Sequence, residues 1–383
     1  MSAPLVYVIA GEASGDLLAG HVMQSMNDMT GQGIRFAGIG GETMQKAGLK
    51  SLFPMNDLSV MGVFEVLPKV PHLLKRIRQT IDDIIEKQPD VILTVDSPDF
   101  CFRVIKGLKK RGYVKPCVHY VAPSVWAWRP KRAAYVAQFL DHLFCLLPFE
   151  PPYFQEHGLD ATYVGHSAVE GGAMHAQASR FRKKYNIPSS QTILTLLPGS
   201  REGEINRHLD LFLDTAQDVQ KRYQKMQVVI PTLSQFKDGI KEKLEDRKIQ
   251  GLVIDSAEDK YDAFAASAVA LAASGTVTLE LALTNTPTVV SYKMSPLTAF
   301  LAKRLVKVEY VSLVNLILQR KVVPEHLLEN ARVGTLSDSL IQILDGNGAK
   351  HQKSAFSEVR EVLRADDEIT PSMIAAQKLL QMI

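Results

Sequence analysis

Residues 5–16 have the sequence LVYVIAGEASGD, in which six apolar residues lead directly into a glycine-rich loop. A run that is apolar on both faces is typical of a strand buried in a parallel sheet. Beyond the loop, apolar residues recur with helical spacing at Leu18, Val22, Met26 and Met29. A buried strand, a tight loop and a helix in this order predict the first unit of a doubly wound α/β domain.

The same alternation of apolar strands and helical patterns continues through the rest of the chain. Further short apolar runs predict strands at 35–39, 91–95, 117–121, 142–147, 161–164, 192–197, 227–231, 251–255, 268–272 and 287–292. Helical spacing fills the gaps between them, for example at 70–85, 209–219 and 297–306. Strands that alternate with helices indicate parallel sheets, so the sequence predicts an α/β fold with two doubly wound domains.

A weakly patterned stretch at 165–178, rich in small residues, predicts the boundary between the two domains. We therefore expect one Rossmann-like domain over 1–168 and a second over 169–345. The remaining residues, 346–383, have helical patterns, and we expect them either to cross back to the first domain or to be exchanged in a dimer. Ligands of open α/β sheets bind beyond the carboxyl ends of the strands, so the candidate site lies in those loops, in a cleft between the domains.

Composition and charge exclude several classes of protein. Of the 383 residues, 46% are hydrophobic and 22% are charged, which is typical of a globular chain and not of a disordered or fibrous one. A net charge of +3 is too small to indicate a nucleic-acid partner. The three cysteines are widely spaced and fit neither a disulfide framework nor a zinc site. No basic segment precedes the first apolar run and no run of 18 uncharged apolar residues occurs, so we expect a cytoplasmic protein, soluble or peripheral to a membrane.

Carboxylates follow two of the strands predicted in the first domain. Glu12 lies in the first glycine-rich loop, which lacks both the G-x-G-x-x-G fingerprint and the lysine of a phosphate loop and therefore suits a neutral, hydroxylated group. Asp96 ends the strand at 91–95, where it is well placed to act as a general base. Asp99 either assists in the site or caps the next helix, and Ser14 has the same two alternatives in its own loop.

The loop after the strand at 117–121 contains both tryptophans of the chain, Trp126 and Trp128. Aromatic faces often stack on sugar rings, which makes Trp126 a candidate sugar-binding residue; the alternative is that both side chains fill the core of a rigid loop. His119 and His142 lie in apolar strands, so we expect them to be core residues rather than metal ligands.

Two stretches of the first domain are rich in basic residues. Nine lysines and arginines, and no acidic residue, occur from 103 to 132. A second run interleaves apolar and basic side chains: Val66, Leu67, Lys69, Val70, Leu73, Leu74, Lys75, Arg76 and Arg78. Basic residues beside an apolar stripe suit an anionic membrane surface and acyl chains, and the alternative is a solvated helix face.

The motif LPGSR at 197–201 ends the first strand of the second domain. A glycine, the hydroxyl of Ser200 and the guanidinium of Arg201 precede a helix there, and this combination predicts an anion cradle. The alternative is an exposed arginine on a turn. The sequence contains no D-x-D motif and its histidines lack ligand spacing, so we expect neither a metal ion nor another cofactor.

The motif ASGTVTLE at 273–280 follows another predicted strand of the second domain. Ser274, Gly275 and Thr276 offer N–H and O–H donors that suit a phosphate at the start of a helix. One turn later Glu280 offers a carboxylate that suits a ribose diol. An anion-binding loop followed by a diol acceptor favours a nucleoside diphosphate, and the alternative is that the hydroxyls only cap the helix.

These motifs resemble, in the same order along the chain, the sequence blocks of the bacterial lipid-A-disaccharide synthases, which form glycosyltransferase family 19. The matching blocks are GEASGD at 11–16, VMGVFEVL at 60–67, DSPDF at 96–100, PSVWAWR at 123–129, LPFE at 147–150, GH at 165–166, LPGSR at 197–201, ASGTVTLE at 273–280 and AKRLVKVEYVSLVNLI at 302–317. They span nearly the whole chain, and the loop at 273–280 is a conservative variant of the family's usual one.

The resemblance implies a GT-B fold, in which two Rossmann-like domains face a cleft and the second binds the UDP-sugar. It implies the condensation of UDP-2,3-diacylglucosamine with 2,3-diacylglucosamine 1-phosphate, which yields a β-1,6-linked lipid A disaccharide 1-phosphate and UDP. This step of lipopolysaccharide synthesis takes place at the cytoplasmic face of the Gram-negative inner membrane. The resemblance therefore also implies a peripheral membrane enzyme, and a homodimer with exchanged C-terminal segments.

For such an inverting transfer we expect Asp96 to accept the proton of the attacking acceptor hydroxyl, with Glu12 or Asp99 assisting. Arg201 and the donors at 274–276 are expected to stabilise the leaving diphosphate, in place of a metal. Glu280 is expected to hold the uridine ribose, and Asn315 to contact the nucleotide or its diphosphate. The acceptor or its sugar is expected to contact Ser14, Asp99 and Trp126.

Three other classes of protein compete with this interpretation. Another UDP-sugar-dependent GT-B enzyme, such as a peptidoglycan glycosyltransferase or a UDP-sugar epimerase, would share the nucleotide site. A nucleotide-dependent oxidoreductase is disfavoured by the missing glycine fingerprint. A non-catalytic lipid-binding protein would release no UDP when the two lipid substrates are mixed.

Overall fold

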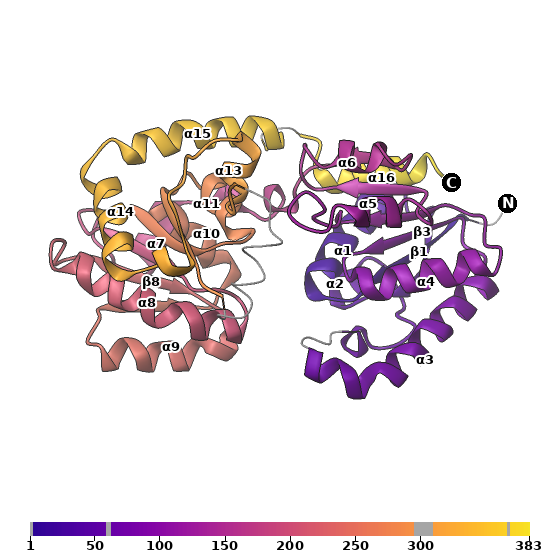
Figure 1. The fold of residues 1–383 in the computed structure, drawn as a ribbon, viewed down its shortest axis with the longest axis horizontal. Helices are drawn as coiled ribbons and strands as arrows, with labels where there is room; N and C mark the ends of the chain where they lie inside the picture. Colours follow the sequence, from indigo (N-terminus) through magenta and orange to yellow (C-terminus); the bar gives the residue numbers. More distant parts are fainter. Residues whose placement is uncertain (1–2, 59–62, 295–308, 366–367) are drawn as a thin grey trace. The chain divides into compact units, whose positions relative to one another are not determined.

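The computed structural model describes residues 3–58, 63–294, 309–365 and 368–383, and within them the side chains of 63–69 are not described. The chain divides into two compact units (Figure 1). We call residues 1–167 with 368–383 unit 1, and residues 168–367 unit 2. The predicted helix at 297–306 lies outside the described residues.

Unit 1 is built on a six-stranded parallel sheet in the order β2-β1-β3-β4-β5-β6. Its strands are β1 (Leu5–Ala10), β2 (Arg35–Ile39), β3 (Val91–Val95), β4 (Cys117–Tyr120), β5 (His142–Cys145) and β6 (Asp160–Tyr163). Its helices are α1 (Ala13–Thr30), α2 (Glu42–Lys46), α3 (Val63–Lys87), α4 (Pro98–Lys110), α5 (Lys131–Val136), α6 (Pro151–Gln155) and α16 (Pro371–Leu380).

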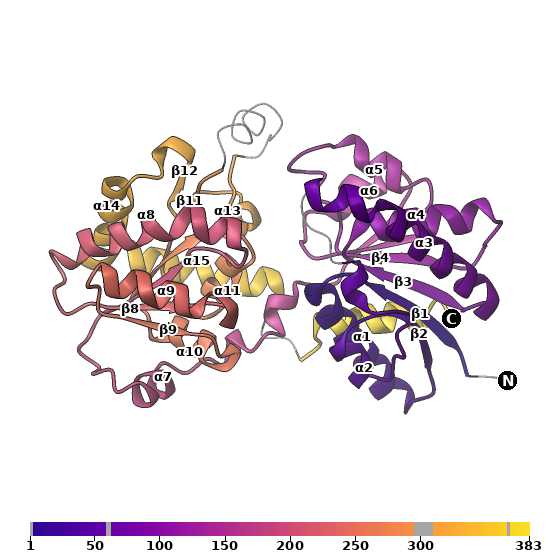
Figure 2. The same cartoon turned by 90° about the horizontal axis from the view of Figure 1, so that it is seen from below.

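Helices cover both faces of this sheet, with α1 and α2 on one face and α3 and α4 on the other (Figure 2). Alternate residues of β1 enter two separate cores, because successive side chains of a strand point to opposite faces. Tyr7 and Ile9 pack with α3, α4 and α5. Val6 and Val8 pack with α1 and α16. The strand is thus buried on both sides, as its apolar run predicts.

Unit 2 repeats the architecture with a six-stranded parallel sheet in the order β12-β11-β10-β7-β8-β9. Its strands are β7 (Ile193–Leu197), β8 (Gln227–Pro231), β9 (Gly251–Ile254), β10 (Val269–Ala273), β11 (Thr288–Tyr292) and β12 (Glu325–Leu327). Its helices are α7 (Ala178–Lys184), α8 (Glu202–Gln220), α9 (Ser234–Asp246), α10 (Ala257–Ala266), α11 (Val277–Leu283), α13 (Leu313–Leu318), α14 (Val333–Asp345) and α15 (Gly348–Leu363). Short 3-10 turns complete the chain at Met55–Asp57, Ser167–Val169, Ala173–His175 and Leu328–Asn330.

The predicted α/β fold class is confirmed, and each predicted strand is present within two residues of its expected bounds. The short edge strand β12 was not predicted, because its three residues are only half-buried and carry no apolar run. The segment predicted as 346–383 is divided between the units. Helix α15 packs on α11, α13 and α14 of unit 2, whereas α16 packs on α1 of unit 1. Among the described residues, no helix has the length and apolar character needed to span a membrane.

Two histidines predicted as core residues do lie in the sheet of unit 1. His119 is fully buried, and its Nδ1 lies 2.8 Å from Oγ1 of Thr94. Burial, and secondarily the charge of Arg132, lowers the pKa of His119 to about 3, so the ring is neutral at physiological pH. The half-buried His142 bonds through Nε2 to the hydroxyl of Thr162 at 2.9 Å. The core interpretation is confirmed for His119, whereas His142 is only partly buried.

Candidate active site

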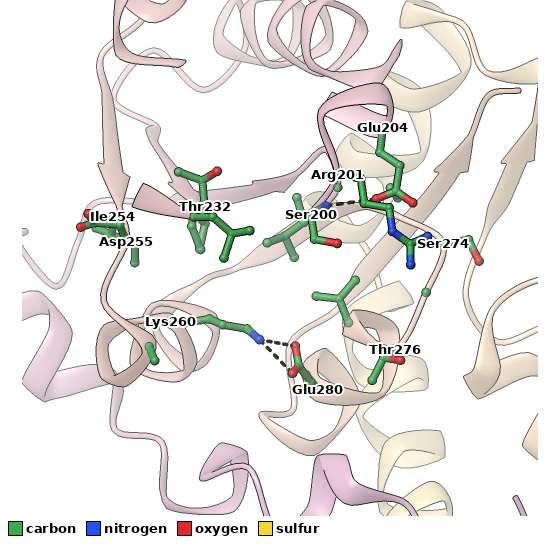
Figure 3. Close-up of a pocket in the computed structure, with 18 of the residues that line it drawn as sticks. Ser200, Arg201, Glu204, Thr232, Ile254, Asp255, Lys260, Ser274, Thr276 and Glu280 are labelled. Atoms are coloured by element: carbon green, nitrogen blue, oxygen red, sulfur yellow. Dashed lines mark hydrogen bonds and ion pairs between the residues drawn. The ribbon is translucent and has the colours of Figure 1, made fainter. Parts of the chain in front are cut away.

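A cavity of about 750 Å³ in unit 2 lies beyond the carboxyl ends of β7, β8, β9 and β10. Its wall combines the loop after β7, which carries Ser200 and Arg201, with the loop after β10, which carries Ser274 and Thr276 (Figure 3). Glu280, on α11, also lines it. The structure therefore brings the two predicted motifs of the second half into one site, because neighbouring parallel strands end at the same edge of the sheet.

The loop after β7 is held by a close backbone turn. Gly199 has φ +134°, and a Cβ at that position would stand 2.4 Å from Cβ of Glu204. The carboxylate of Glu204 accepts the N–H of Ser200 at 3.1 Å. This turn leaves Arg201 at the N-terminal cap of α8 with an exposed side chain, at the same end of the cavity as Glu204 and Ser274 (Figure 3). The guanidinium is thus accessible to an anion.

The loop after β10 differs in part from its expected role. The hydroxyl of Ser274 donates to the carbonyl oxygen of Val311 at 2.9 Å, so its proton is not available to a phosphate. Gly275 is exposed, and no atom lies within 4 Å of the place where its Cβ would stand. Thr276 is exposed at the N-terminal cap position of α11, where its side chain makes no capping bond. The donors that this loop presents are therefore those of Gly275 and Thr276.

Glu280 is fixed by two residues of α10. The ammonium of Lys260 lies 2.8 Å from Oε1 and 2.7 Å from Oε2 of Glu280, and the hydroxyl of Tyr261 donates to Oε1 at 3.1 Å. Burial, and then the charge and hydrogen bond of Glu280, raises the pKa of Tyr261 well above its ordinary range. Lys260 also lines the cavity. It was not predicted, because a lysine on the polar face of an amphipathic helix looks like any other surface lysine in the sequence.

Asn315 does not occupy its predicted place in the nucleotide site. It is fully buried, its amide nitrogen donates to Val323 and Glu325, and its oxygen accepts the N–H groups of Val322 and Val323. Every hydrogen-bonding position of the amide is used within the chain. Asn315 therefore organises the segment that precedes β12. The predicted direct contact with the nucleotide is replaced by this structural role.

Unit 1 has a second cavity, of about 360 Å³, with walls of opposite character. Its polar wall comes from the loops after β1 and β3 and from the start of α4: Glu12, Ser97, Asp99 and Arg103. Its apolar wall comes mainly from α3: Leu58, Val70, Leu73, Leu74, Ile77 and Phe100. The structure thus joins two of the predicted carboxylates, Glu12 and Asp99, to three residues of the predicted acyl-chain stripe. We call this space the amphipathic cavity.

Asp96 stands at the end of β3 in an uncommon backbone conformation. Both Asp96 and Ser97 have positive φ, at +54° and +42°. Such conformations cost energy in non-glycine residues and cluster at functional sites. The hydroxyl of Ser14 donates to Oδ2 of Asp96 at 3.2 Å, and the N–H of Ser97 donates to Oδ1 at 2.9 Å. The carboxylate is therefore oriented beside the amphipathic cavity, although Asp96 does not itself line it.

The loop after β1 approaches the Asp96 turn closely. A Cβ at Gly11 would stand 2.4 Å from Oγ of Ser97, so this position requires glycine. Ser14 does not cap α1, since Glu12 occupies the cap position and no side chain bonds there. The neighbouring Asp16 is buried and accepts three N–H groups at the start of α2, which makes it structural.

The tryptophan loop is anchored by a buried acid. Trp126 is half-buried, packs edge-on against Phe149, and donates its indole N–H to Glu150 at 3.1 Å. Burial raises the pKa of Glu150 to about 7, against the N–H groups of Leu147 and Trp126 that favour its ionised form. Trp126 lines neither of the two cavities described above. Its predicted contact with a sugar stays a prediction.

The basic and apolar run on α3 is only partly free for a membrane. Val66, Leu67 and Lys69 lie outside the described side chains. Lys75 and Arg78 are exposed, as a surface role requires. Arg76 is not: it pairs with Asp57 at 2.5 Å and stacks on the ring of Phe53 at 4.5 Å. The expected contact of Arg76 with lipid head groups is therefore corrected to an intramolecular one.

Comparison with known proteins places the chain among sequence relatives of one activity. Residues 6–378 match the sequence model of the family described as lipid-A-disaccharide synthetase. The chain is 44% identical over 381 residues to the lipid-A-disaccharide synthase of Rhodospirillum centenum, which covers 99% of this chain and 94% of that protein. It is 43% identical to the synthase of Paramagnetospirillum magneticum, over 92% of this chain and 90% of that protein.

Solved structures with low sequence identity share the fold. A structure of S. aureus MnaA with UDP has a TM-score of 0.63 at 12% identity, and covers 98% of this chain and 95% of that one. A UDP-GlcNAc 2-epimerase from Neisseria meningitidis, bound to UDP-GlcNAc, has a TM-score of 0.58 at 10% identity over 99% of both chains. The chain therefore has the GT-B fold, with two Rossmann-like units.

Proposed function

The chain belongs to the lipid-A-disaccharide synthase family, and on that premise we propose how its two cavities divide the reaction. It is a glycosyltransferase of lipid A biosynthesis that condenses UDP-2,3-diacylglucosamine with 2,3-diacylglucosamine 1-phosphate. The products are the β-1,6-linked disaccharide 1-phosphate and UDP. The division of labour rests on the contrast between a cavity in unit 2 that carries an exposed arginine and an oriented carboxylate, Arg201 and Glu280, and an amphipathic cavity in unit 1 with an apolar helix face as one wall.

We propose that the cavity of unit 2 binds the UDP-sugar. Its volume of about 750 Å³ lies in the range of small-molecule sites. Arg201, Gly275 and Thr276 supply cationic and N–H donors for the diphosphate, and the oriented carboxylate of Glu280 suits the ribose diol. The UDP bound to structural relatives such as S. aureus MnaA supports this choice of ligand. This combination is the single observation on which the proposal depends.

We propose that the amphipathic cavity of unit 1 binds the acylated acceptor. A diacylated sugar carries hydroxyls at one end and hydrocarbon at the other, which matches a cavity with Glu12 and Asp99 on one wall and Leu73 and Leu74 on the other. Burial of hydrocarbon against such a wall contributes roughly 0.8 kcal/mol per methylene. The exposed Val70 and Leu74 and the exposed Lys75 then lie where an enzyme peripheral to the inner membrane would meet the bilayer.

The chemical step in this proposal is a single inverting displacement. Asp96 accepts the proton of the acceptor 6-hydroxyl while that oxygen attacks the anomeric carbon, and the bond from that carbon to UDP breaks. Glu12 or Asp99 orients the hydroxyl. Arg201 stabilises the negative charge that develops on the departing diphosphate. The proposal includes the homodimer, which sedimentation of the purified enzyme tests directly.

The test measures UDP release from UDP-diacylglucosamine under three conditions: with the diacylated 1-phosphate, with its deacylated form and without acceptor. We expect release with the first, at least tenfold less with the second, and almost none with the third, because the apolar wall contributes binding energy only to acylated acceptor. Equal release with the deacylated acceptor would contradict the acceptor site. Conversion of a UDP-sugar to its C2 epimer without UDP release would instead favour an epimerase, the activity named for several structural relatives.

A further inference from the structure

Unit 1 has another cavity, of about 440 Å³, between α3, α4 and α5, which we call the α4 groove. Its floor is apolar and is formed by Ile77, Ile81 and Phe102. Gly107 allows the helices to approach at this point, since a Cβ there would stand 2.3 Å from Cδ1 of Ile81. The groove is therefore a shaped feature of the fold, with a closely packed base, and not a gap between loosely placed side chains.

The walls of the α4 groove carry a large excess of positive charge. Arg103, Lys106 and Lys110 line it from α4, where their spacing places them on one face of the helix. Arg132 lines it from α5. Asp99, at the start of α4, is the one acidic residue among its lining residues. Four cations thus face one carboxylate around a single depression.

These cations lack the ion pairs that their neighbours have. On the same helix, Lys109 pairs with Asp141 at 2.8 Å, and Arg111, directly after it, pairs with Asp82 at 2.5 Å. Across the described residues, no ion pair involves the side chains that line the groove. Lys106 donates to the hydroxyl of Tyr135 at 3.2 Å, and Arg132 lies over the ring of Phe102. Aromatic contacts hold these two cations without neutralising them, which leaves the site suited to an anion.

The α4 groove is continuous with the amphipathic cavity. Asp99 and Arg103 line both spaces, and because they are four residues apart they lie on the same face of α4. Four residues of α-helix span about 6 Å, so Arg103 lies roughly one sugar ring from the residues at the start of α4. A ligand whose hydroxyl lies beside the Ser97 loop would therefore place a group at its far end against Arg103.

We propose that the α4 groove is the phosphomonoester subsite of the acceptor. The proposal rests on the proposed function, in which the acceptor bears a phosphate on C1 and attacks through the hydroxyl on C6, at opposite ends of its sugar. Arg103 binds the phosphate at the junction of the two cavities, with the bidentate geometry that guanidinium groups offer. Lys106 and Arg132 add charge behind it. The subsite thereby selects the phosphorylated acceptor and fixes which end of the sugar faces Asp96.

The experiment compares acceptors with and without the 1-phosphate in neutral detergent micelles that contain no anionic lipid. UDP release is measured for the wild type, Arg103→Gln and Lys106→Gln, with Arg111→Gln as the matched control, since Arg111 is equally cationic but paired outside the groove. For Arg103→Gln we expect kcat/KM for the phosphorylated acceptor to fall roughly tenfold to hundredfold, mainly through KM. With the dephosphorylated acceptor it should fall much less, whereas Arg111→Gln should keep the wild-type preference.

Other outcomes would overturn the proposal in distinguishable ways. An equal loss of kcat/KM with both acceptors would show that Arg103 does not bind the phosphate. A loss that appears on anionic vesicles but not in neutral micelles would show that the groove contacts the bilayer instead of the substrate. Binding of UDP to each variant, measured by calorimetry, reports folding and the unit 2 site independently. If the wild type released no UDP with either acceptor, the proposed function itself would fail, whatever the variants did.

Discussion

The two units share one architecture and differ in what their loops present. In both, the strand that comes first along the chain, β1 or β7, lies inside a six-stranded parallel sheet and ends at a glycine-containing loop. After β1 that loop meets an apolar helix face and forms the amphipathic cavity. After β7 it presents Arg201 to a cavity with fixed polar donors and acceptors. A common fold thus supplies the geometry, while a few loop residues distinguish the proposed acceptor site from the proposed nucleotide site.

Removal of the proposed base from unit 1 is expected to have the largest effect on the reaction. Asp96→Asn keeps the size of the side chain and its contact with Ser14, but it cannot accept a proton. We expect kcat to fall by roughly 10²- to 10⁴-fold, the range of general-base catalysis. UDP affinity, measured by calorimetry, should be unchanged because the proposed UDP site lies in unit 2. A folded Asp96→Asn enzyme with wild-type turnover would refute the assignment of the base.

The reciprocal change removes a carboxylate from the proposed nucleotide site of unit 2. Glu280→Gln loses the charge that pairs with Lys260 and the carboxylate proposed for the ribose. We expect the Kd for UDP to rise by roughly tenfold to hundredfold, in line with hydrogen bonds to a charged group. Glu258→Gln is the matched control, because Glu258 is exposed on α10 and does not line the cavity. Equal losses in the two variants would show that the effect is general and not one of this site.

Two acids of low exposure, Glu150 in unit 1 and Glu280 in unit 2, are expected to differ in how their protonation affects stability. Glu280 pairs with a cation, whereas the carboxylate of Glu150 accepts hydrogen bonds from neutral N–H groups. The folded-state pKa of Glu150 is raised from 4.5 to about 7, so the native state holds this proton more tightly than the unfolded state does. Stability from this group is therefore full below about pH 4.5 and declines as the pH rises to about 7.

Glu150→Gln should remove that part of the pH dependence. We expect the difference in free energy of unfolding between pH 5 and pH 8, measured by urea titration, to shrink by up to about 3 kcal/mol relative to the wild type. Glu156→Gln, at an exposed position directly after α6, should leave the wild-type slope intact. An unchanged slope in Glu150→Gln would mean that the acid is ionised in the native state throughout this range.

The smallest change contrasts one glycine from each unit. Gly11→Ala would force a Cβ against the Ser97 side chain, whereas Gly275→Ala would enter open space. We expect the former to lower the free energy of unfolding by about 1–3 kcal/mol, the usual cost of overpacking, and the latter to change it by less than about 0.5 kcal/mol. Thermal melts of both variants provide the measurement. Similar melting temperatures would show that the loop after β1 is less constrained than the structure indicates.

Residues whose role depends on a local pattern were predictable from the sequence. The strands other than β12 were found because each coincides with a short, largely apolar run of four to six residues. Arg201 and Glu280 were found because their motifs follow such strands directly. The fold and the positions of the site loops were therefore accessible without coordinates.

Residues whose role depends on a distant partner were not predictable. Lys260 reaches Glu280 across two helices, and Arg76 is withdrawn from the surface by Asp57, 19 positions earlier. Asn315 looked like a ligand-binding amide, yet its partners at 322–325 use all of its hydrogen-bonding capacity. Side-chain pairing over such separations leaves no periodicity in a single sequence, so the structure alone reveals it.

The docking of α16 on α1 has a consequence for how the protein is made. Ala375, Ala376 and Leu379 are fully buried in the same core as Val22 and Met23, so residues from both extremes of the described chain close one half of unit 1. A ribosome delivers all of unit 2 before it delivers α16. Unit 2 can thus fold while unit 1 still exposes the apolar face that α16 will cover. Although most of unit 1 is translated before unit 2, its core is completed after unit 2 has been translated.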